Sequence, residues 1–350
     1  CGLLPAAGAA DGDLTAASPA DAATAAQPCR PITWLYVDNT VVYDINDDTA
    51  VSVAQTAGYY VQAESGEGKW EKWVPADGAE KPQSSYFHFD GVNTLTLHNV
   101  EIETGYIVEG AGAGIYAEGD LIISLEGENR IDLPDGTMMP SNIAVLGDLY
   151  LQGEGCLKIN DGDYGILCAY AVTVSGNVSV ELYSENSSYI GIQAGIPEES
   201  ADSCVTICDN ASVKIKSVNN HDVVGIGVQA SSASSSIIVC DTATLDMDLS
   251  GAWENGIWIN SSSLSGAPAK TASFSITDQA RVSINATGEN VFCIGVGGGD
   301  TSVAISGDAQ LTTNAICSDK DINDVQYMGI ATWSEEGDVE INICENARVT

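Results

Sequence analysis

The segment GIWI at Gly256–Ile259 decides the fold, because it recurs along the chain in closely related forms. Eight segments align with it, namely GIYA, NIAV, GILC, GIQA, GIGV, GIWI, CIGV and GIAT. Their central isoleucines are Ile115, Ile143, Ile166, Ile192, Ile226, Ile257, Ile294 and Ile330. Successive isoleucines are separated by 23 to 37 residues. A motif that returns at such intervals, with loops of variable length, is typical of a solenoid of stacked repeats.

Each repeat carries two further short segments in which apolar and polar residues alternate. The second segment takes forms such as CVTICD, SIIVCD and SFSITD, and the third follows an alanine, as in ASVKIKS, ATLDMDL and ARVSINA. Alternation with a period of two is typical of half-buried strands, and Gly, Asn, Asp and Ser punctuate every repeat. Three short strands per repeat predict an all-β parallel β-helix, whose stacked rungs bury their Ile, Val and Leu columns in one core.

The segments before the repeats suggest export and an N-terminal cap. Residues 1–10, CGLLPAAGAA, are interpreted as the end of a secretory signal peptide, with a lipoprotein cysteine at Cys1 as the alternative. Residues 11–28 are predicted to be a disordered linker rich in Ala, Thr, Asp and Pro. Residues 29–85 are predicted to form a β cap. We therefore expect a secreted or extracellular protein attached to the cell surface.

The β-helix is predicted to occupy residues 86–350. The chain ends at Thr350 within a third strand, so we expect the β-helix to continue beyond this residue. An uncapped end would expose open strand edges that favour aggregation. Apart from the N-terminal segment, no apolar run of membrane-spanning length is present, and no membrane insertion is expected.

The charge balance narrows the range of partners. Asp and Glu number 49 against 12 Lys and Arg, which gives a net charge of −37. Such a surface repels nucleic acids and anionic membranes, and it suits cations or neutral partners. An acidic surface can also serve solubility alone. The ten cysteines contain no C-x-x-C pair and indicate neither a zinc motif nor a disulfide framework, so they are interpreted mostly as small buried residues.

Acidic residues recur in the turn that follows the second strand. Asp209, Asp241 and Asp278 take the same position in successive repeats, where neighbouring carboxylates would stack about 5 Å apart. A cation would relieve the repulsion between them, so this column is the candidate calcium site. The alternative is that aspartate only stabilises the turn by accepting hydrogen bonds from nearby backbone amides.

The basic residues are better explained as partners of acidic residues than as catalytic bases. One outward column of the third strand is predicted to contain Asp132, Lys158, Glu181, Lys214 and Asp246. Opposite charges on neighbouring strands stabilise a sheet, and these lysines are therefore not free bases. The three histidines are scattered, and no Ser-His-Asp or Cys-His arrangement stands out. The chain is predicted not to be an enzyme.

Trp258 is expected to point outward, because Ile257 and Ile259 occupy inward columns and side chains alternate along a strand. Its column contains Tyr116, Ala144, Leu167, Gln193, Gly227, Trp258, Gly295 and Ala331. With glycine on both sides, the ring either lies flat on two bare backbones or forms an aromatic floor for a sugar. The candidate glycan-binding residues are Trp258, Trp253 and Tyr116.

Two stretches resemble a known family. YFHFDGVNTLTLHNVEIETG (86–105) and GIYAEGDLIISLEGENRI (114–131) resemble carbohydrate-binding-domain or adhesin-like surface proteins of gut Firmicutes and related clostridia. The resemblance implies a right-handed parallel β-helix, similar to pectate lyases, that binds acidic plant polysaccharide with calcium and does not cleave it. The expected function is carbohydrate binding or adhesion, with polysaccharide or a host glycan as the partner. The alternatives are a polysaccharide lyase of the pectate-lyase type and a structural stalk.

Overall fold

The computed structural model divides the chain into two units, Cys1–Arg30 and Pro31–Thr350, and nearly all described residues belong to the second. The described residues are 30–45, 53–63, 69–75, 79–108, 111–133, 140–185, 188–196, 201–218, 220–262, 269–317, 327–334 and 337–350. The signal peptide and the linker predicted for residues 1–10 and 11–28 lie outside these ranges.

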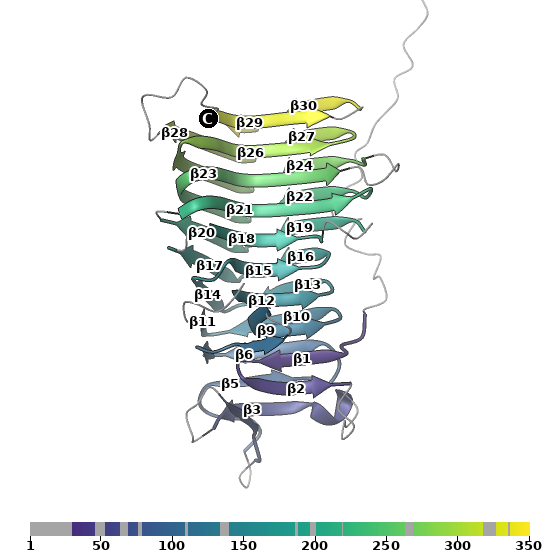
Figure 1. Ribbon diagram of the computed structural model, residues 1–350, viewed down its shortest axis with the longest axis vertical. Helices are drawn as coiled ribbons and strands as arrows, with labels where there is room; N and C mark the ends of the chain where they lie inside the picture. Colours follow the sequence, from purple (N-terminus) through teal and green to yellow (C-terminus); the bar gives the residue numbers. More distant parts are fainter. Residues whose placement is uncertain are drawn as a thin grey trace, which may run out of the picture. The chain divides into compact units, whose positions relative to one another are not determined.

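Within the described residues, every element except the 3-10 turn η1 (Val53–Thr56) is a β-strand (Figure 1). The protein is therefore all-β, with long sheets of parallel strands. The strands that carry the Gly-Ile motif pair with one another in parallel, and they are β9 (Ala111–Glu118), β12 (Pro140–Leu146), β15 (Tyr164–Cys168), β18 (Ser188–Ala194), β21 (Asn220–Ser231), β23 (Thr244–Ser262), β26 (Asn290–Gly298) and β29 (Tyr327–Ser334).

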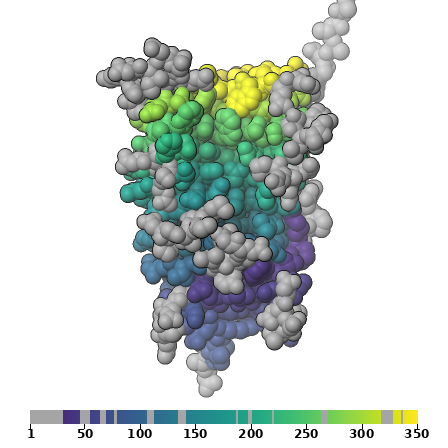
Figure 2. Space-filling model, viewed as in Figure 1, coloured from purple at the N-terminus to yellow at the C-terminus, as the bar shows by residue number. Residues whose placement is uncertain are grey.

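The second strands of the repeats form a separate parallel sheet. They are β6 (Thr94–His98), β10 (Leu121–Glu126), β13 (Leu149–Gly153), β16 (Ala171–Val174), β19 (Ser203–Ile207), β22 (Ser235–Val239), β24 (Ala272–Ile276), β27 (Thr301–Ile305) and β30 (Val339–Ile343). Each strand therefore pairs with its equivalent in the next repeat, and the repeats follow one another as coloured bands in the space-filling view (Figure 2).

The third strands also pair in parallel from repeat to repeat. They are β7 (Glu101–Ile102), β11 (Glu128–Asp132), β14 (Cys156–Asn160), β17 (Ser179–Ser184), β20 (Ser212–Ser217), the first part of β23, β25 (Arg281–Gly288), β28 (Gln310–Cys317) and β31 (Arg348–Val349). Strand β23 runs without interruption from this set into the Gly-Ile set, so one strand joins the two.

The predicted isoleucine stack is confirmed by the strand register. Each of the first seven isoleucines has the isoleucine of the next repeat as its Cα partner, up to Ile330 in the last repeat. Seven have no exposed surface, and Ile330 in the last repeat is partly buried. Burial of one such side chain contributes about 1.5–3 kcal/mol, so this column is a main source of stability.

Antiparallel strands precede the repeats. Strands β1 (Trp34–Val37) and β2 (Thr40–Asp44) form a hairpin, and β1 also pairs antiparallel with β9. Strands β3 (Gly58–Gln62), β4 (Trp70–Lys72) and β5 (Tyr86–Phe89) pair antiparallel, and β5 lies along β6. A short strand, β8 (Tyr106–Val108), pairs antiparallel with β9. The cap strands carry buried residues that join the core, including Leu35, Phe87 and Phe89.

At the other end of the stack, the side chains of β30 remain uncovered. Val339, Ile341 and Ile343 are 50%, 49% and 52% exposed, whereas their partners Thr301, Val303 and Ile305 in β27 are buried. Nothing in the described part of the chain stacks on β30. The apolar face of this last strand is therefore open.

The predicted charge column is correct in four places and wrong in one. Lys158 pairs with Glu181, Glu181 with Lys214, and Lys214 with Asp246. The first member is Arg130, because the register of β11 places Arg130 opposite Lys158 and Asp132 opposite Asn160.

Candidate functional site

Two tryptophans form an aromatic pair on the outer face of the Gly-Ile sheet. Trp258 lies in β23 and Trp333 in β29, with β26 between them. The ring centroids are 4.8 Å apart and the ring planes are inclined by 38°. Both side chains are half-buried. The outward direction predicted for Trp258 is confirmed, because its side chain is partly exposed while Ile257 and Ile259 beside it are fully buried. Its Cα partners are Gly227 and Gly295, as the predicted column requires.

Glycines of β26 make room for the two rings. A Cβ atom added at Gly295 would lie 2.8 Å from Cε3 of Trp258, and one added at Gly297 would lie 2.1 Å from Cε2 of Trp333. Both rings therefore rest directly on the backbone of β26. On the other side of Trp258 the expectation of a second bare backbone is wrong, because Oε1 of Gln193 lies over Gly227.

Polar side chains adjoin the aromatic pair. Gln229 and Asn260 are aligned with Gly297 and Trp333 in a column next to that of Trp258. Both amides are partly exposed. A half-exposed aromatic surface with amide groups beside it can stack on an apolar ring face while it exchanges hydrogen bonds with hydroxyl groups.

The other two candidate glycan residues do not join this pair. Trp253 is 54% exposed and lies five residues before Trp258 on β23, which corresponds to about 16 Å along a strand. Tyr116 stands five strands away in the Trp258 column and stacks on Tyr36 of the cap, with ring centroids 5.1 Å apart. The sequence analysis missed Trp333 as a candidate site residue. Its alignment with Gly297 in the preceding repeat could have indicated it, because Trp258 is likewise aligned with a glycine.

The acidic turn column forms a ladder of hydrogen bonds between neighbouring repeats. Asp209, Asp241 and Asp278 all have positive φ angles, between 59° and 62°, which aspartate tolerates better than most residues. An Oδ2 atom of Asp209 accepts a hydrogen bond from the amide of Gly176 at 2.8 Å. In the same way Asp241 accepts from the amide of Asp209 at 3.0 Å and Asp278 from that of Asp241 at 3.3 Å. The turn-forming role is thus supported, and calcium stays a prediction.

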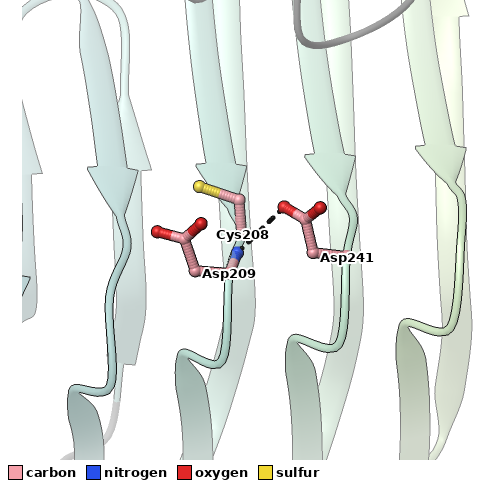
Figure 3. A group of neighbouring side chains, drawn as sticks. All are labelled: Cys208, Asp209 and Asp241. Atoms are coloured by element: carbon pink, nitrogen blue, oxygen red, sulfur yellow. Dashed lines mark hydrogen bonds between the residues drawn. The ribbon is translucent and has the colours of Figure 1, made fainter.

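Two cysteines stand beside the first two of these aspartates. Cys208 and Cys240 directly follow the paired strands β19 and β22 and precede Asp209 and Asp241. Figure 3 shows Cys208 with the two aspartates. One ligand atom each from Cys208, Asp209 and Asp241 lie within 4.8 Å of one another. A hydrogen bond between the two thiols lowers the pKa of Cys208 and raises that of Cys240.

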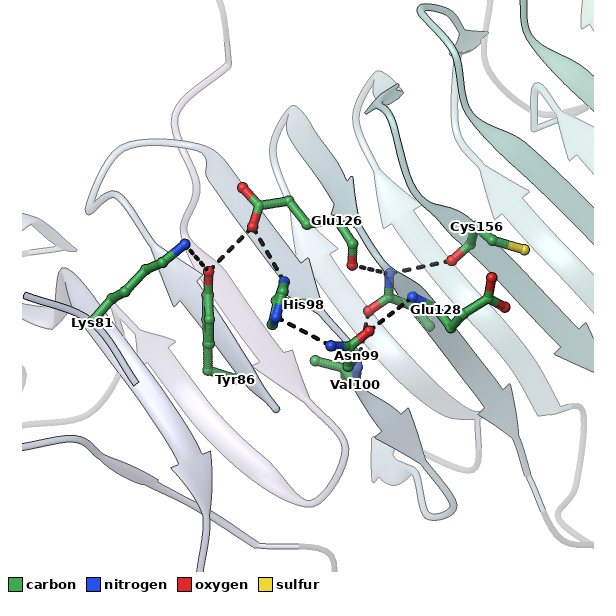
Figure 4. Close-up of polar contacts among 9 residues, drawn as sticks. Lys81, Tyr86, His98, Asn99, Val100, Glu126, Glu128 and Cys156 are labelled. Atoms are coloured by element: carbon green, nitrogen blue, oxygen red, sulfur yellow. Dashed lines mark hydrogen bonds and ion pairs between the residues drawn. The ribbon is translucent and has the colours of Figure 1, made fainter. Parts of the chain in front are cut away.

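A polar network links the cap to the first repeats. Lys81 donates to the Tyr86 hydroxyl at 3.4 Å, and Tyr86 donates to Glu126 at 3.2 Å (Figure 4). Nδ1 of His98 lies 3.3 Å from a carboxylate oxygen of Glu126, but the two atoms are not aligned for a hydrogen bond. Nε2 of His98 lies 3.1 Å from the side-chain amide nitrogen of Asn99.

The three histidines are scattered along the sequence, but His98 has close neighbours in the fold. The register of β6 and β10 places His98 opposite Glu126, and its ring stacks on Tyr86 at 4.7 Å. Both of its ring nitrogens face groups of the protein, which favours a role in joining β5, β6 and β10.

The carboxyl group of Glu254 lies among buried apolar residues. Glu254 is 1% exposed and has the buried Val223 and Val291 as its partners in neighbouring strands. Neither carboxyl oxygen has a partner of good hydrogen-bond geometry in the described residues. The pKa of Glu254 is raised to about 7, mainly because burial disfavours the charged carboxylate. The backbone of Thr287 and Gly251 lowers this pKa, and the negative charge of Asp248 raises it further.

Comparison of the chain with protein-family models, with curated proteins and with solved structures gives no match. In the part of the chain that the structure describes, no helix has the length and apolar character needed to cross a membrane.

Proposed function

We propose that the protein is a non-catalytic carbohydrate-binding or adhesin-like domain of an exported surface protein, built as a right-handed parallel β-helix with three strands per rung. The three sets of parallel strands, each paired with its equivalent in the next repeat, support this architecture. The resemblance of residues 86–105 and 114–131 to adhesin-like surface proteins supports the location and the class of function.

The aromatic pair of Trp258 and Trp333 is the observation that carries the proposal. The glycines under the rings hold them against the sheet, so their outer faces are oriented in advance. The apolar face of a sugar ring stacks on such a surface, and Gln229 and Asn260 are placed to bond its hydroxyl groups. The net charge of −37 disfavours polyanions, so the expected ligand is a polysaccharide or host glycan of neutral sugars and not the acidic polysaccharide that the resemblance implies.

A glycan array with the whole chain, followed by calorimetric titration of the best oligosaccharide, tests this proposal. Trp258→Ala and Trp333→Ala should each lower the affinity about two- to tenfold, since one aromatic contact contributes about 0.5–1.5 kcal/mol. Trp253→Ala is the matched control, because it removes an exposed tryptophan from the same strand, and it should leave the affinity unchanged.

The alternative role of the two rings is to shield the backbone of β26. In that case Trp258→Ala would lower the melting temperature while glycan binding, if any, continued. Unchanged binding by the double variant Trp258→Ala/Trp333→Ala, with its circular dichroism spectrum intact, would exclude this surface as the glycan site. A chain that binds no glycan on the array would refute the carbohydrate-binding proposal as a whole.

A further inference from the structure

Neighbouring repeats bring two thiols and two carboxylates together on one edge of the molecule. Cys208 and Asp209 follow one second strand, and Cys240 and Asp241 follow the next; Figure 3 shows Cys208, Asp209 and Asp241. From this arrangement we propose that Cys208, Asp209, Cys240 and Asp241 form a binding site for a thiophilic divalent cation, of which Zn²⁺ is the representative. The proposal is independent of glycan binding.

The spacing of the ligand atoms suits a small tetrahedral ion. Sγ of Cys208 and one oxygen each from Asp209 and Asp241 lie within 4.8 Å of one another. In a tetrahedral zinc site the ligand atoms are about 3.5 Å apart, as bond lengths of about 2.0–2.3 Å require. Both aspartates are exposed, and rotation of their side chains can close this difference.

Cys240 supplies a fourth ligand from the inner side. Its Sγ lies 3.6 Å from Oδ2 of Asp241, and the strand that it follows pairs with the strand before Cys208. Cys240 is only 7% exposed, whereas Cys208 is partly exposed. The cation would therefore have sulfur beneath it and carboxylates toward solvent. Each thiol that coordinates it releases its proton to the solvent.

The two sulfur atoms distinguish this site from the rest of the turn column. At the next repeat Thr277 takes the place of a cysteine before Asp278, and Cys344 faces Ser306 in its neighbouring repeat. Thiolates select ions such as Zn²⁺ and Cd²⁺, whereas Ca²⁺ requires six to eight oxygen ligands. Calcium, predicted from the aspartates alone, is therefore not the ion expected at Asp209 and Asp241.

Titration of the reduced full chain with Cd²⁺ tests the proposal. Cadmium–thiolate bonds give an ultraviolet charge-transfer band, and we expect this band to saturate at one ion per chain. Zn²⁺ should displace the band and raise the melting temperature, and Ca²⁺ at the same concentration should do neither. Cys208→Ser and Cys240→Ser should weaken Cd²⁺ binding by at least about tenfold, since each removes a thiolate ligand.

Cys344→Ser is the matched control, because Cys344 takes the same place in a turn where no second thiol is adjacent. It should leave the titration unchanged. The two test variants are expected to fold, because Ser175 and Ser306 take this position in other repeats. Absence of the band in the reduced parent chain, or its persistence in the folded double variant Cys208→Ser/Cys240→Ser, would overturn the proposal.

Discussion

Glu254 shows how a single residue can depart from the repeat that surrounds it. Its position lies three residues before Ile257, where the neighbouring repeats carry Val223 and Val291. The repeat therefore predicts an apolar, buried side chain, and the structure buries a carboxyl group there. Because desolvation disfavours the charged form, the folded protein holds this group protonated up to about pH 7.

Glu254→Gln should remove a pH dependence from the stability of the protein. In the unfolded chain the pKa is near 4.5, and folding raises it to about 7. The folded state therefore binds the proton more tightly, and the free energy of unfolding of the parent should fall between these pH values as the pH rises. Above pH 7 the variant should be more stable by an amount on the order of 3 kcal/mol.

Urea unfolding of parent and variant between pH 4 and about 8 measures this difference, and other carboxyl groups cancel in the comparison. The two curves should converge toward pH 4. A constant separation across the whole range would mean that Glu254 keeps an ordinary pKa in the folded protein.

At this scale the sequence predicts residues that follow the pattern and misses those that depart from it. Ile226 and its equivalents were predictable, because each has the same neighbours in every repeat. The contact between Trp258 and Trp333 was not, since it joins two different columns across β26. The side-chain conformation that places Gln193 over Gly227 is likewise not encoded in the periodicity.

Between elements, the third strands are joined by side-chain charges as well as by the backbone. Nζ of Lys214 lies 3.6 Å from Glu181, and Lys158 lies 3.5 Å from Glu128. The sequence alignment identified the charged column but not its first member, because β11 begins at Glu128, opposite Cys156. A shift of two residues keeps every side chain on its face, so the alternation of apolar residues alone does not reveal it.

Lys214→Glu should destabilise the protein by a modest amount that depends on salt. The variant places three acidic side chains in successive strands, at positions 181, 214 and 246. Because these side chains are well exposed, the loss should not exceed about 1 kcal/mol at low ionic strength. Melting temperatures in low and high NaCl measure it. Lys214→Gln, which removes the charge without reversing it, should lose less, and a loss that salt does not reduce would indicate packing instead.

The whole molecule carries its acidic charge on a stack of strands whose core is mostly apolar, with Glu254 as an exception. The stacked architecture was predictable, because eight copies of one motif leave few other ways to bury their isoleucines. The antiparallel pairing of β1 with β9 and of β5 with β6 was not, since the cap segments share no motif with the repeats.

Salt should stabilise the whole molecule through its net charge of −37. Repulsion among the carboxylates opposes the compact state, and an ionic strength of 0.15 M shortens its range to about 8 Å. We expect the melting temperature to rise as NaCl is increased from a few millimolar to about 0.15 M. An equal osmolality of sucrose, which does not screen charge, is the control. A melting temperature that is flat in NaCl would show that the acidic groups are already compensated within the fold.

The pairing of each strand with its equivalent in the next repeat also determines how the molecule would respond to mechanical load. The backbone hydrogen bonds run along the stack, so a force applied to its two ends pulls them apart one row at a time. A detached repeat such as the 31 residues from Ile226 to Ile257 would lengthen the chain by about 100 Å. Under tension the domain would therefore yield by releasing one repeat after another, and each step would limit the force transmitted to its partner.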